Sequence, residues 1–456
     1  MTDVRENFSD LLRDLLEDGD DFKIVAHLEG VHPADLALAL SHLDADEALR
    51  VFQLLDEEAS SEILAEADED LRSRLTERIP DQELSELLEE MDPDDAADLV
   101  GDIEDAERQQ RILSLMSEVE RAEVEDLLSH HEETAGGIMT SEYLAFPESW
   151  TVQNTRTFLA QAPPETPFTM AYTIDDHGRF LGGFPIQELI WRPANERLAT
   201  LTDREFPRVS ADTDQEEVAR LFTRYDLISI PVVDEDGRLA GRITVDDILD
   251  VVSEETSEDM FRMAGSSEDE LFTRSAWGVL RFRLPWLLVA LLGGIVCAFI
   301  LGRFEYELSR FTYLAFYLPV IMTMGGNIGN QSSTLIVRGI ATGHLDSGRI
   351  FRVIWKEVRV AILMGTFCGF LVALFSSTFA FLKGDPTAIG LIVGLSMTVS
   401  MMIAGLFASI VPLTFSKLGI DPAVASGPFI TMSNDGLGII VYFTITQFFH
   451  PWLIGG

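Results

Sequence analysis

The sequence predicts a multidomain membrane protein with an all-α superhelical N-terminal domain, a duplicated α/β module and an α-helical transmembrane domain of five spans. Three observations support this fold class. Residues 1–270 hold 69 Asp and Glu against 21 Lys and Arg, whereas residues 271–456 hold 7 against 12. Apolar residues recur about every 12 positions near the start of the chain, and long apolar stretches fill its last part. Two physically different regions therefore meet near residue 280.

The acidic excess limits the partners of the first region. The formal net charge of the chain is −43. Such a surface repels nucleic acid and anionic lipid and attracts cations, so we expect no nucleic-acid partner. A general solubility device, or adaptation to a salty cytoplasm, is the alternative explanation of the excess. The N-terminus has no apolar signal segment, which predicts a cytoplasmic location for this region. Both cysteines, Cys297 and Cys368, lie in apolar segments, so we expect no structural disulfide.

Residues 1–135 carry a helical repeat. Apolar residues recur at a spacing of about 12 from Leu43 to Leu128, and an acid precedes most of the intervening segments: Asp44, Asp56, Asp68, Asp81, Asp92 and Glu104. Asp before a short apolar-periodic segment is an N-cap signal. Each unit is then one short helix, and pairs of helices stack into a small superhelical solenoid. A plain acidic helical bundle is the alternative.

Two copies of one α/β unit follow, over residues 136–200 and 201–252. GRFLGGFPIQELI begins at Gly178 and GRLAGRITVDDIL at Gly237, a spacing of 59 residues. A β-branched run closed by an acid and glycine indicates a strand and a turn. The pattern resembles a tandem pair of CBS domains, which often bind adenine nucleotides. The resemblance makes Thr244 and Asp247 candidate ribose ligands and ATP a candidate ligand, although Thr244 as a mere helix cap is the alternative. The first copy lacks this Thr–Asp pair.

Five stretches are long and apolar enough to span a bilayer, which requires about 20 residues each. They are residues 284–302, 312–340, 360–382, 388–414 and 425–449. Basic residues gather before the first stretch, within 349–359 and at Lys417. The positive-inside rule then predicts a multi-pass protein of the cell membrane with its N-terminus in the cytoplasm and its C-terminus outside.

The apolar cores of these stretches contain one carboxylate, Asp435, and an intramembrane acid indicates function. Helical spacing places small and polar residues on its face, and the second stretch offers amides and a hydroxyl at three- and four-residue steps. The candidate pore ligands are Asp435, Gly427, Thr431, Asn327, Asn330 and Thr334. One carboxylate with amide oxygens suits Mg²⁺, which keeps much of its water. A helix–helix hydrogen bond or a proton relay is the alternative role of Asp435.

Two long motifs identify a resemblance that covers nearly the whole chain. LPVIMTMGGNIGNQSSTLIVRGIATG (318–343) and DPAVASGPFITMSNDGLGIIVYF (421–443) resemble the membrane domain of MgtE-type magnesium transporters. The helical repeats, the CBS pair and the spans follow in that family's order. The resemblance implies a homodimer with its pore between the subunits, a transmembrane domain over residues 281–456, and Asp435 as the pore Mg²⁺ ligand.

The resemblance also implies a gating mechanism. Residues 253–280 would connect the CBS pair to the pore as a plug helix. When the cytoplasmic Mg²⁺ concentration is high, Mg²⁺ ions would bridge this helix and neighbouring acids. The candidate regulatory ligands are Asp92, Asp94, Asp95, Asp214, Glu216, Asp226, Asp247, Asp250, Glu255, Glu258 and Asp259. For each acid, an ordinary solvated surface is the alternative.

Three functions remain open at this point. Mg²⁺ import gated by cytoplasmic Mg²⁺ is the prediction, and transport of another divalent cation such as Mn²⁺ or Co²⁺ is the alternative within transport. A membrane-anchored nucleotide sensor is an alternative of another class. No nucleophile–base pair, phosphate-binding glycine loop or zinc pattern indicates an enzyme.

Overall fold

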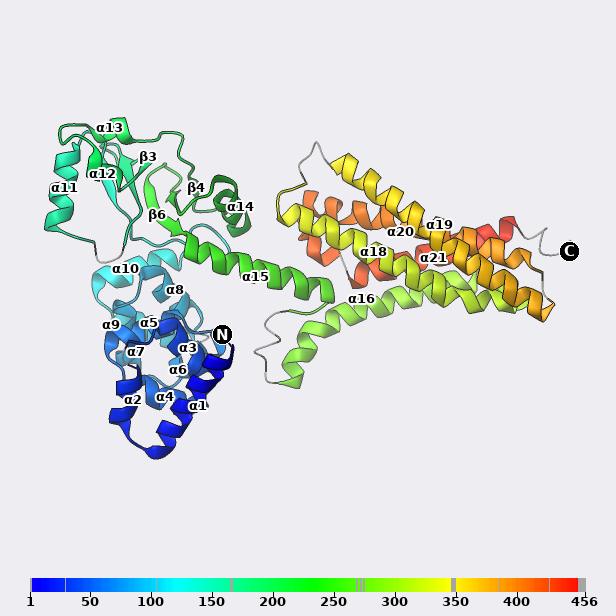
Figure 1. Ribbon diagram of the computed structural model, residues 1–456, viewed down its shortest axis with the longest axis horizontal. Helices are drawn as coiled ribbons and strands as arrows, with labels where there is room; N and C mark the ends of the chain where they lie inside the picture. Colours follow the sequence, from blue (N-terminus) through cyan, green and yellow to red (C-terminus); the bar gives the residue numbers. More distant parts are fainter. Residues whose placement is uncertain are drawn as a thin grey trace. The chain divides into compact units, whose positions relative to one another are not determined.

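The computed structural model describes residues 2–28, 30–103, 105–164, 167–267, 270, 273, 275–345, 350–384, 386–425 and 427–449. The chain divides into two compact units, Met1–Val252 and Ser253–Gly456. Figure 1 shows helices throughout both units and strands in the first alone. Each unit is described by itself below.

The first unit begins with short helices joined by tight turns. Their bounds are α1 Thr2–Asp18, α2 Asp21–Leu28, α3 Pro33–Ser41, α4 Ala45–Phe52, α5 Glu57–Ala65, α6 Glu69–Thr76, α7 Asp81–Glu89, α8 Pro93–Gly101, α9 Ala106–Leu115 and α10 Glu118–Leu127. From α3 to α8, each helix begins 12 residues after the one before it. Helices two apart in sequence contact each other, as α3 with α5 and α5 with α7. This stacking confirms the predicted superhelical domain.

Acidic caps explain most of the helix starts. Asp44, Asp56 and Asp68 are N-caps whose carboxylates accept hydrogen bonds from the first turn. Two of the predicted acids are not shown as N-caps. Asp81 is the first residue of α7, whose N-cap is Pro80. The N-cap of α9 is Asp105, and the predicted acid before it, Glu104, falls outside the described residues.

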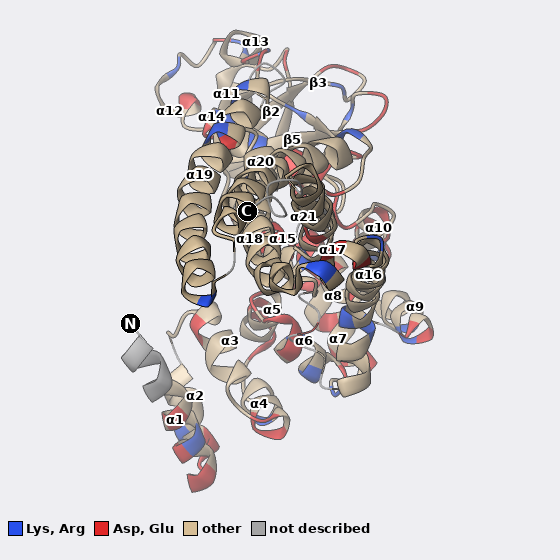
Figure 2. Ribbon diagram, turned by 90° about the vertical axis from the view of Figure 1, so that its right-hand side faces the viewer, with Lys and Arg blue, Asp and Glu red and all other residues tan. Residues whose placement is uncertain are grey.

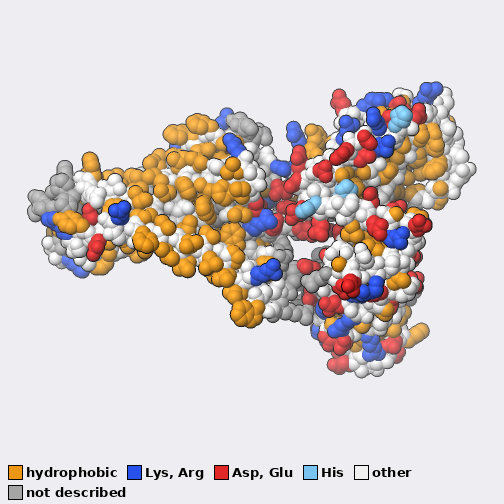
Figure 3. All heavy atoms as spheres, turned by 180° about the vertical axis from the view of Figure 1, so that it is seen from behind, with side chains coloured by type: hydrophobic (Ala, Val, Ile, Leu, Met, Phe, Trp, Pro, Cys, Tyr) orange, Lys and Arg blue, Asp and Glu red, His pale blue; other side chains and the backbone are white. Residues whose placement is uncertain are grey.

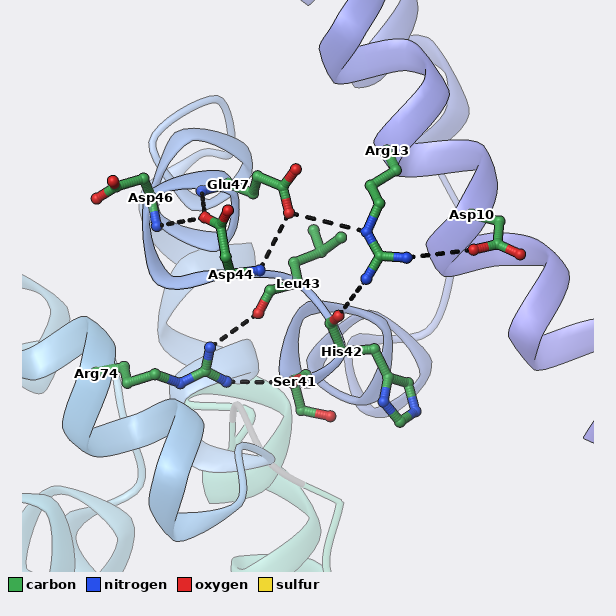
Figure 4. A network of polar contacts seen from close by, with 9 residues as sticks. All are labelled: Asp10, Arg13, Ser41, His42, Leu43, Asp44, Asp46, Glu47 and Arg74. Carbon is green, nitrogen blue, oxygen red and sulfur yellow. Dashed lines mark hydrogen bonds and ion pairs between the residues drawn. The ribbon is translucent and has the colours of Figure 1, made fainter. Parts of the chain in front are cut away.

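Arginines join neighbouring helices of this domain (Figure 4). Arg74 donates to the carbonyl oxygens of Leu43 and Ser41 at 2.9 and 3.2 Å, and Arg13 donates to that of His42 at 2.6 Å. These carbonyls follow the end of α3, where the helix leaves acceptors without intrahelical partners. The arginine side chains therefore complete a helix terminus and tie three helices together.

Each copy of the duplicated module forms a three-stranded sheet. The first contains β1 Ala145–Pro147, β2 Met170–Ile174 and β3 Phe180–Pro185; the second contains β4 Val209–Ser210, β5 Ser229–Val233 and β6 Leu239–Thr244. In both sheets the first pair is parallel and the second antiparallel. The turn glycines Gly178 and Gly237 both have a φ of 78°, so the duplication extends to backbone conformation. The accompanying helices are α11 Val152–Gln161, α12 Glu188–Trp191, α13 Leu198–Leu201 and α14 Gln215–Tyr225.

The second unit is a helical bundle. After α15 (Val245–Ala264), which begins in the first unit, come α16 Ala276–Gly302, α17 Glu305–Arg310, η2 Thr312–Tyr317, α18 Leu318–Ala341, α19 Ile350–Lys383, α20 Ala388–Lys417, η3 Pro422–Ala425 and α21 Pro428–Phe448. Apolar side chains cover the visible outer face of this bundle (Figure 3), and charges are sparse on α18–α21 compared with α1–α10 (Figure 2).

The helices agree with the predicted membrane domain, with differences at their ends. α16, α19 and α20 are each long and apolar enough to cross a membrane. α18 and α21, of 24 and 21 residues, contain the polar residues that lower their hydropathy. The start of the second predicted span, 312–317, is a 3₁₀ helix, and the helical linker expected over 253–280 ends at Ala264. Five spans remain the predicted number.

Candidate functional site

Asp435 lies on α21 beside a polar contact with α18. The Thr431 hydroxyl, one turn before Asp435, donates to the Asn330 side-chain oxygen at 3.3 Å. The two helices approach closely because glycines of α18 face α21: a Cβ at Gly326 would lie 3.5 Å from the Thr431 methyl. Two of the predicted pore residues, Thr431 and Asn330, are therefore brought together, and Asp435 lies one turn after Thr431 on α21.

The other two predicted residues of α18 lie on its outer face. Asn327 and Thr334 are exposed, one turn to either side of Asn330. A bilayer offers no hydrogen-bond partners to such side chains. This polar strip therefore requires water or another polypeptide beside it.

Gly427 has a backbone role that the sequence did not reveal. It is the N-cap of α21 with φ 54°, a conformation that favours glycine. A Cβ at this position would also collide with the backbone oxygen of Met263 at the end of α15. Gly427 thus lets α21 begin directly against α15, and any contact with a cation would use its backbone.

One of the buried acids of the bundle, Glu357, was missed. It lies in α19 just before the predicted apolar core, its side chain is 8 % exposed, and it accepts a hydrogen bond from the Ser332 hydroxyl of α18 at 3.1 Å. Its position in a segment rich in Arg and Lys concealed it. An acid flanked by bases usually indicates a surface.

We call the acids around the starts of α8 and α15 the first acidic cluster: Asp92, Asp94, Asp95, Asp246 and Asp247. Asp92 is the N-cap of α8 but makes no side-chain cap hydrogen bond, and Asp94 and Asp95 lie in the first turn. Asp246 and Asp247 occupy the first turn of α15. One carboxylate oxygen of Asp94 is buried without a hydrogen-bond partner among the described atoms.

Electrostatics make this cluster unfavourable when it is fully ionised. Burial, followed by the charges of Asp247 and Asp95, raises the pKa of Asp94 well above its usual value. Burial, followed by the charges of Asp92 and Asp247, raises the pKa of Asp95 to about 6. Burial also raises the pKa of Asp247. The nearby Arg242 is engaged elsewhere, because it donates to the Glu142 carbonyl at 2.7 Å. A proton or a cation would relieve the repulsion.

We call Glu258, Asp259, Arg262 and Asp421 the second cluster; it lies within the second unit. Arg262 pairs with Glu258 and, at 2.6 Å, with Asp421. Burial, followed by the charges of Asp421 and Glu255, raises the pKa of Asp259 to about 6. Sequence reasoning missed Asp421, because its loop is distant in sequence from α15. This cluster contains its own cation.

Of the remaining predicted regulatory acids, Asp250 lies near the first cluster and Glu255 near the second, whereas the acids of α14 converge on neither. Asp214 is the N-cap of α14 and accepts from the Glu216 amide at 2.9 Å, whereas Asp226 caps the other end of this helix with φ 52°. Asp250 lies on α15 one turn after Asp246 and is exposed. The two ends of α14 thus cannot contribute to one ion site.

Thr244 and Asp247 contact each other. The amide and the hydroxyl of Thr244 donate to one Asp247 oxygen at 3.0 and 2.7 Å. This arrangement satisfies the start of α15, as a helix cap would. A bound nucleotide would have to use the other oxygen or replace this contact.

No tight metal cage is preformed in the part of the chain that the structure describes. Among those residues, no three His, Cys, Asp or Glu side chains converge as a metal-binding group. Looser pairs of carboxylates suit Mg²⁺, which usually binds through one or two carboxylates and several waters.

The fold and these sites define a class: a membrane protein in which an acidic, cation-attracting region precedes a helical bundle with a polar internal face. Comparisons with known proteins specify it. A model described as "Divalent cation transporter" matches residues 318–445, one for the MgtE intracellular N domain matches 31–133, and one for the CBS domain matches 198–254. The chain belongs to the MgtE family.

Relatives match over most of their length. The magnesium transporter MgtE of Thermus thermophilus is 36 % identical over 97 % of this chain and 99 % of its own. The magnesium transporter MgtE of Bacillus subtilis is 35 % identical over 74 % of each chain. The crystal structure of the cytosolic domain of the Mg²⁺ channel MgtE in complex with ATP is 37 % identical, with a TM-score of 0.51, over 53 % of this chain and 99 % of that one.

Proposed function

We propose that this chain carries Mg²⁺ across the cell membrane along the face shared by α18 and α21, with Asp435 as its main protein ligand. The observation that supports this most strongly is the Thr431–Asn330 hydrogen bond between α21 and α18, one helical turn from Asp435. A single carboxylate with neighbouring amide and hydroxyl oxygens can hold a largely hydrated Mg²⁺ through its waters. Its relatives are named magnesium transporters, which favours Mg²⁺ over Mn²⁺ or Co²⁺.

The active form is a homodimer with the path between its subunits. The polar strip of Asn327 and Thr334 is exposed in one chain. Pairing two strips about a twofold axis would remove them from lipid and bring two Asp435 side chains near each other. In this arrangement the N-terminus is cytoplasmic and the C-terminus lies outside, as the basic residues predict.

The test of the path is Mg²⁺ flux into vesicles that contain purified protein. D435A should reduce flux to background, because the only strong ligand in the path is lost. E305Q removes an exposed acid of the same unit and should leave flux near normal. Comparable flux through D435A and E305Q would refute the proposal. Equal elution of both variants as dimers excludes misfolding.

Regulation uses the acidic clusters. At low Mg²⁺ the carboxylates repel and loosen the cytoplasmic region, and at high Mg²⁺ bound ions compensate this repulsion and stabilise the closed state. A ligand shifts such an equilibrium only by its differential affinity for the two states. The unpartnered oxygen of Asp94 supports the first acidic cluster as the principal site.

ATP binding at the CBS pair is a second proposal. The related cytosolic domain was solved in complex with ATP. Thr244 and Asp247 are the matching candidates here, and the second oxygen of Asp247 is the one left for a ribose hydroxyl. Calorimetry with the full chain tests this: T244A should weaken ATP binding at constant Mg²⁺, and unchanged affinity would exclude the assignment.

A further inference from the structure

Two side chains of α21 are inserted into glycine positions of the neighbouring helices. Met432 lies against Gly293 of α16, where an added Cβ would overlap the Cγ and Sδ atoms of Met432. Asn434 lies against Gly329 of α18, where an added Cβ would overlap the Asn434 amide nitrogen. An added methyl group at either position would therefore displace the side chain that fills the space above the glycine.

These two contacts lie on either side of Asp435. An α-helix advances by about 100° per residue, so Met432 projects about 60° to one side of Asp435 and Asn434 about 100° to the other. Thr431 lies between Asn434 and Asp435. Rotation of α21 in either direction would drive one inserted side chain into a neighbouring backbone. The contacts with α16 and α18 thus fix the direction in which Asp435 points.

The Asn434 contact is polar as well as steric. Its side chain is 2 % exposed, and its amide nitrogen is 3.5 Å from the Gly325 carbonyl oxygen, whereas its own oxygen has no partner among the described atoms. An unpaired buried acceptor is unfavourable. An apolar side chain such as Met432 fills a glycine notch without this cost. The amide nitrogen can contribute direction instead, through its contact with the Gly325 carbonyl oxygen of α18.

We propose that Met432 and Asn434 are positioning residues that hold α21 at the rotation in which Asp435 faces the cation path. This rests on the proposed function of Asp435. Geometry of this kind matters because a displacement of about 1 Å at a site can cost on the order of 100-fold in rate.

The first test exchanges volume between the two helices. G329A should reduce Mg²⁺ flux about tenfold or more, since the added methyl displaces Asn434. G325A is the matched control: Gly325 is one turn away and also buried, but an added Cβ there meets no atom within 4 Å, so flux should stay within about twofold. N434A/G329A removes the collision and the positioning amide together, so its flux should stay below that of the parent; parental flux in this double variant would mean that Asn434 does not position α21.

The second test measures the direction of position 435 without relying on conduction. In a C297S/C368S background, D435C is modified by a charged, water-soluble thiol reagent. Adding G329A should change the modification rate by about fivefold or more, whereas adding G325A should not. G293A, with G294A as control because its added Cβ also meets nothing within 4 Å, repeats the measurement on α16.

The outcomes separate the two proposals. Equal modification rates in the G329A, G325A and parent backgrounds would overturn the positioning role even if D435A abolishes flux. Normal flux through D435A would refute the path, whatever the modification rates. Should G329A fail to elute as a folded protein, N434A/G329A and the G293A–G294A pair still decide the question.

Discussion

The two acidic clusters differ in where their positive charge comes from. In the second cluster, Arg262 pairs with Asp421 and Glu258, so the chain itself supplies a cation. In the first cluster, Asp94 and Asp95 have mainly other acids around them, although the charges of Arg242 and Arg72 act on Asp92 and Asp95. The second cluster thus has an arginine paired with two of its acids, whereas in the first the acids outnumber the arginines that act on them.

Under the proposed regulation, this difference predicts which acids respond to Mg²⁺. A carboxylate that already has an arginine gains less from a metal ion than one surrounded by like charges. An excess of acid is therefore not a sensor by itself. Under the proposed regulation, the sensor is the subset of acids that folding holds together with the least compensation.

The largest expected effect is loss of Mg²⁺ inhibition when the first acidic cluster is neutralised. D94N/D95N/D247N removes both the repulsion and the ligands that relieve it. The Mg²⁺ concentration that halves flux should rise by about tenfold or more, because each tenfold step corresponds to only about 1.4 kcal/mol of differential binding. Flux into vesicles at increasing internal Mg²⁺ measures it.

E57Q/E58Q/E62Q is the matched control, since it removes three exposed acids from α5 in the same domain. It should leave the inhibition curve within about twofold of the parent, as expected for screened surface charges. If both triple variants shift the curve equally, total charge rather than the cluster controls the channel.

Local patterns predicted the helical domain well. The 12-residue repeat and the acids at Asp44, Asp56 and Asp68 give correct helix starts, because capping depends on neighbours in sequence. The duplicated module was recognisable for the same reason, from its β-branched runs and turn glycines.

Tertiary placement was harder to predict. Asp421 lies beside Asp259 although 162 positions separate them, and the hydrogen-bond partner of the buried Glu357, Ser332, comes from another helix, α18. Asn434 looked like one polar residue in a helix, and nothing local showed that its amide fills the notch at Gly329. The sequence signal that could have suggested it is its position next to the intramembrane acid.

A change in the second cluster should shift the half-inhibiting Mg²⁺ concentration by a smaller amount and in the opposite direction. R262Q leaves Asp421 and Glu258 without their guanidinium, so this cluster comes to resemble the first. Mg²⁺ should then bind there more tightly, and the half-inhibiting concentration should fall by about threefold, which is under 1 kcal/mol. The same flux assay measures it, with R262K as the control that keeps the charge. A rise in the half-inhibiting concentration with R262Q would mean that the arginine itself closes the channel.

The smallest effect concerns pH in the absence of Mg²⁺. The pKa of about 6 at folded Asp95 exceeds that of an unfolded Asp, about 3.9, so the folded state binds more protons between these values. The stability that this protonation contributes is fully present below about pH 4 and is lost as the pH rises through about 6. In EDTA, lowering the pH from 7.5 to 5.5 should therefore raise the melting temperature by a few degrees.

Mg²⁺ should reduce that pH dependence, because an ion at the first acidic cluster replaces the protons there. D95N should reduce it even without Mg²⁺, whereas D259N should reduce it by a separate amount, since burial, Asp421 and Glu255 also raise the pKa of Asp259 to about 6. The two clusters share no residue, so the double variant should show the sum of the single effects. Melting temperatures measured for the full chain in detergent decide this. A melting temperature that falls on acidification in EDTA would show that these carboxylates are stabilised as anions, and the contrast between the clusters would then be wrong.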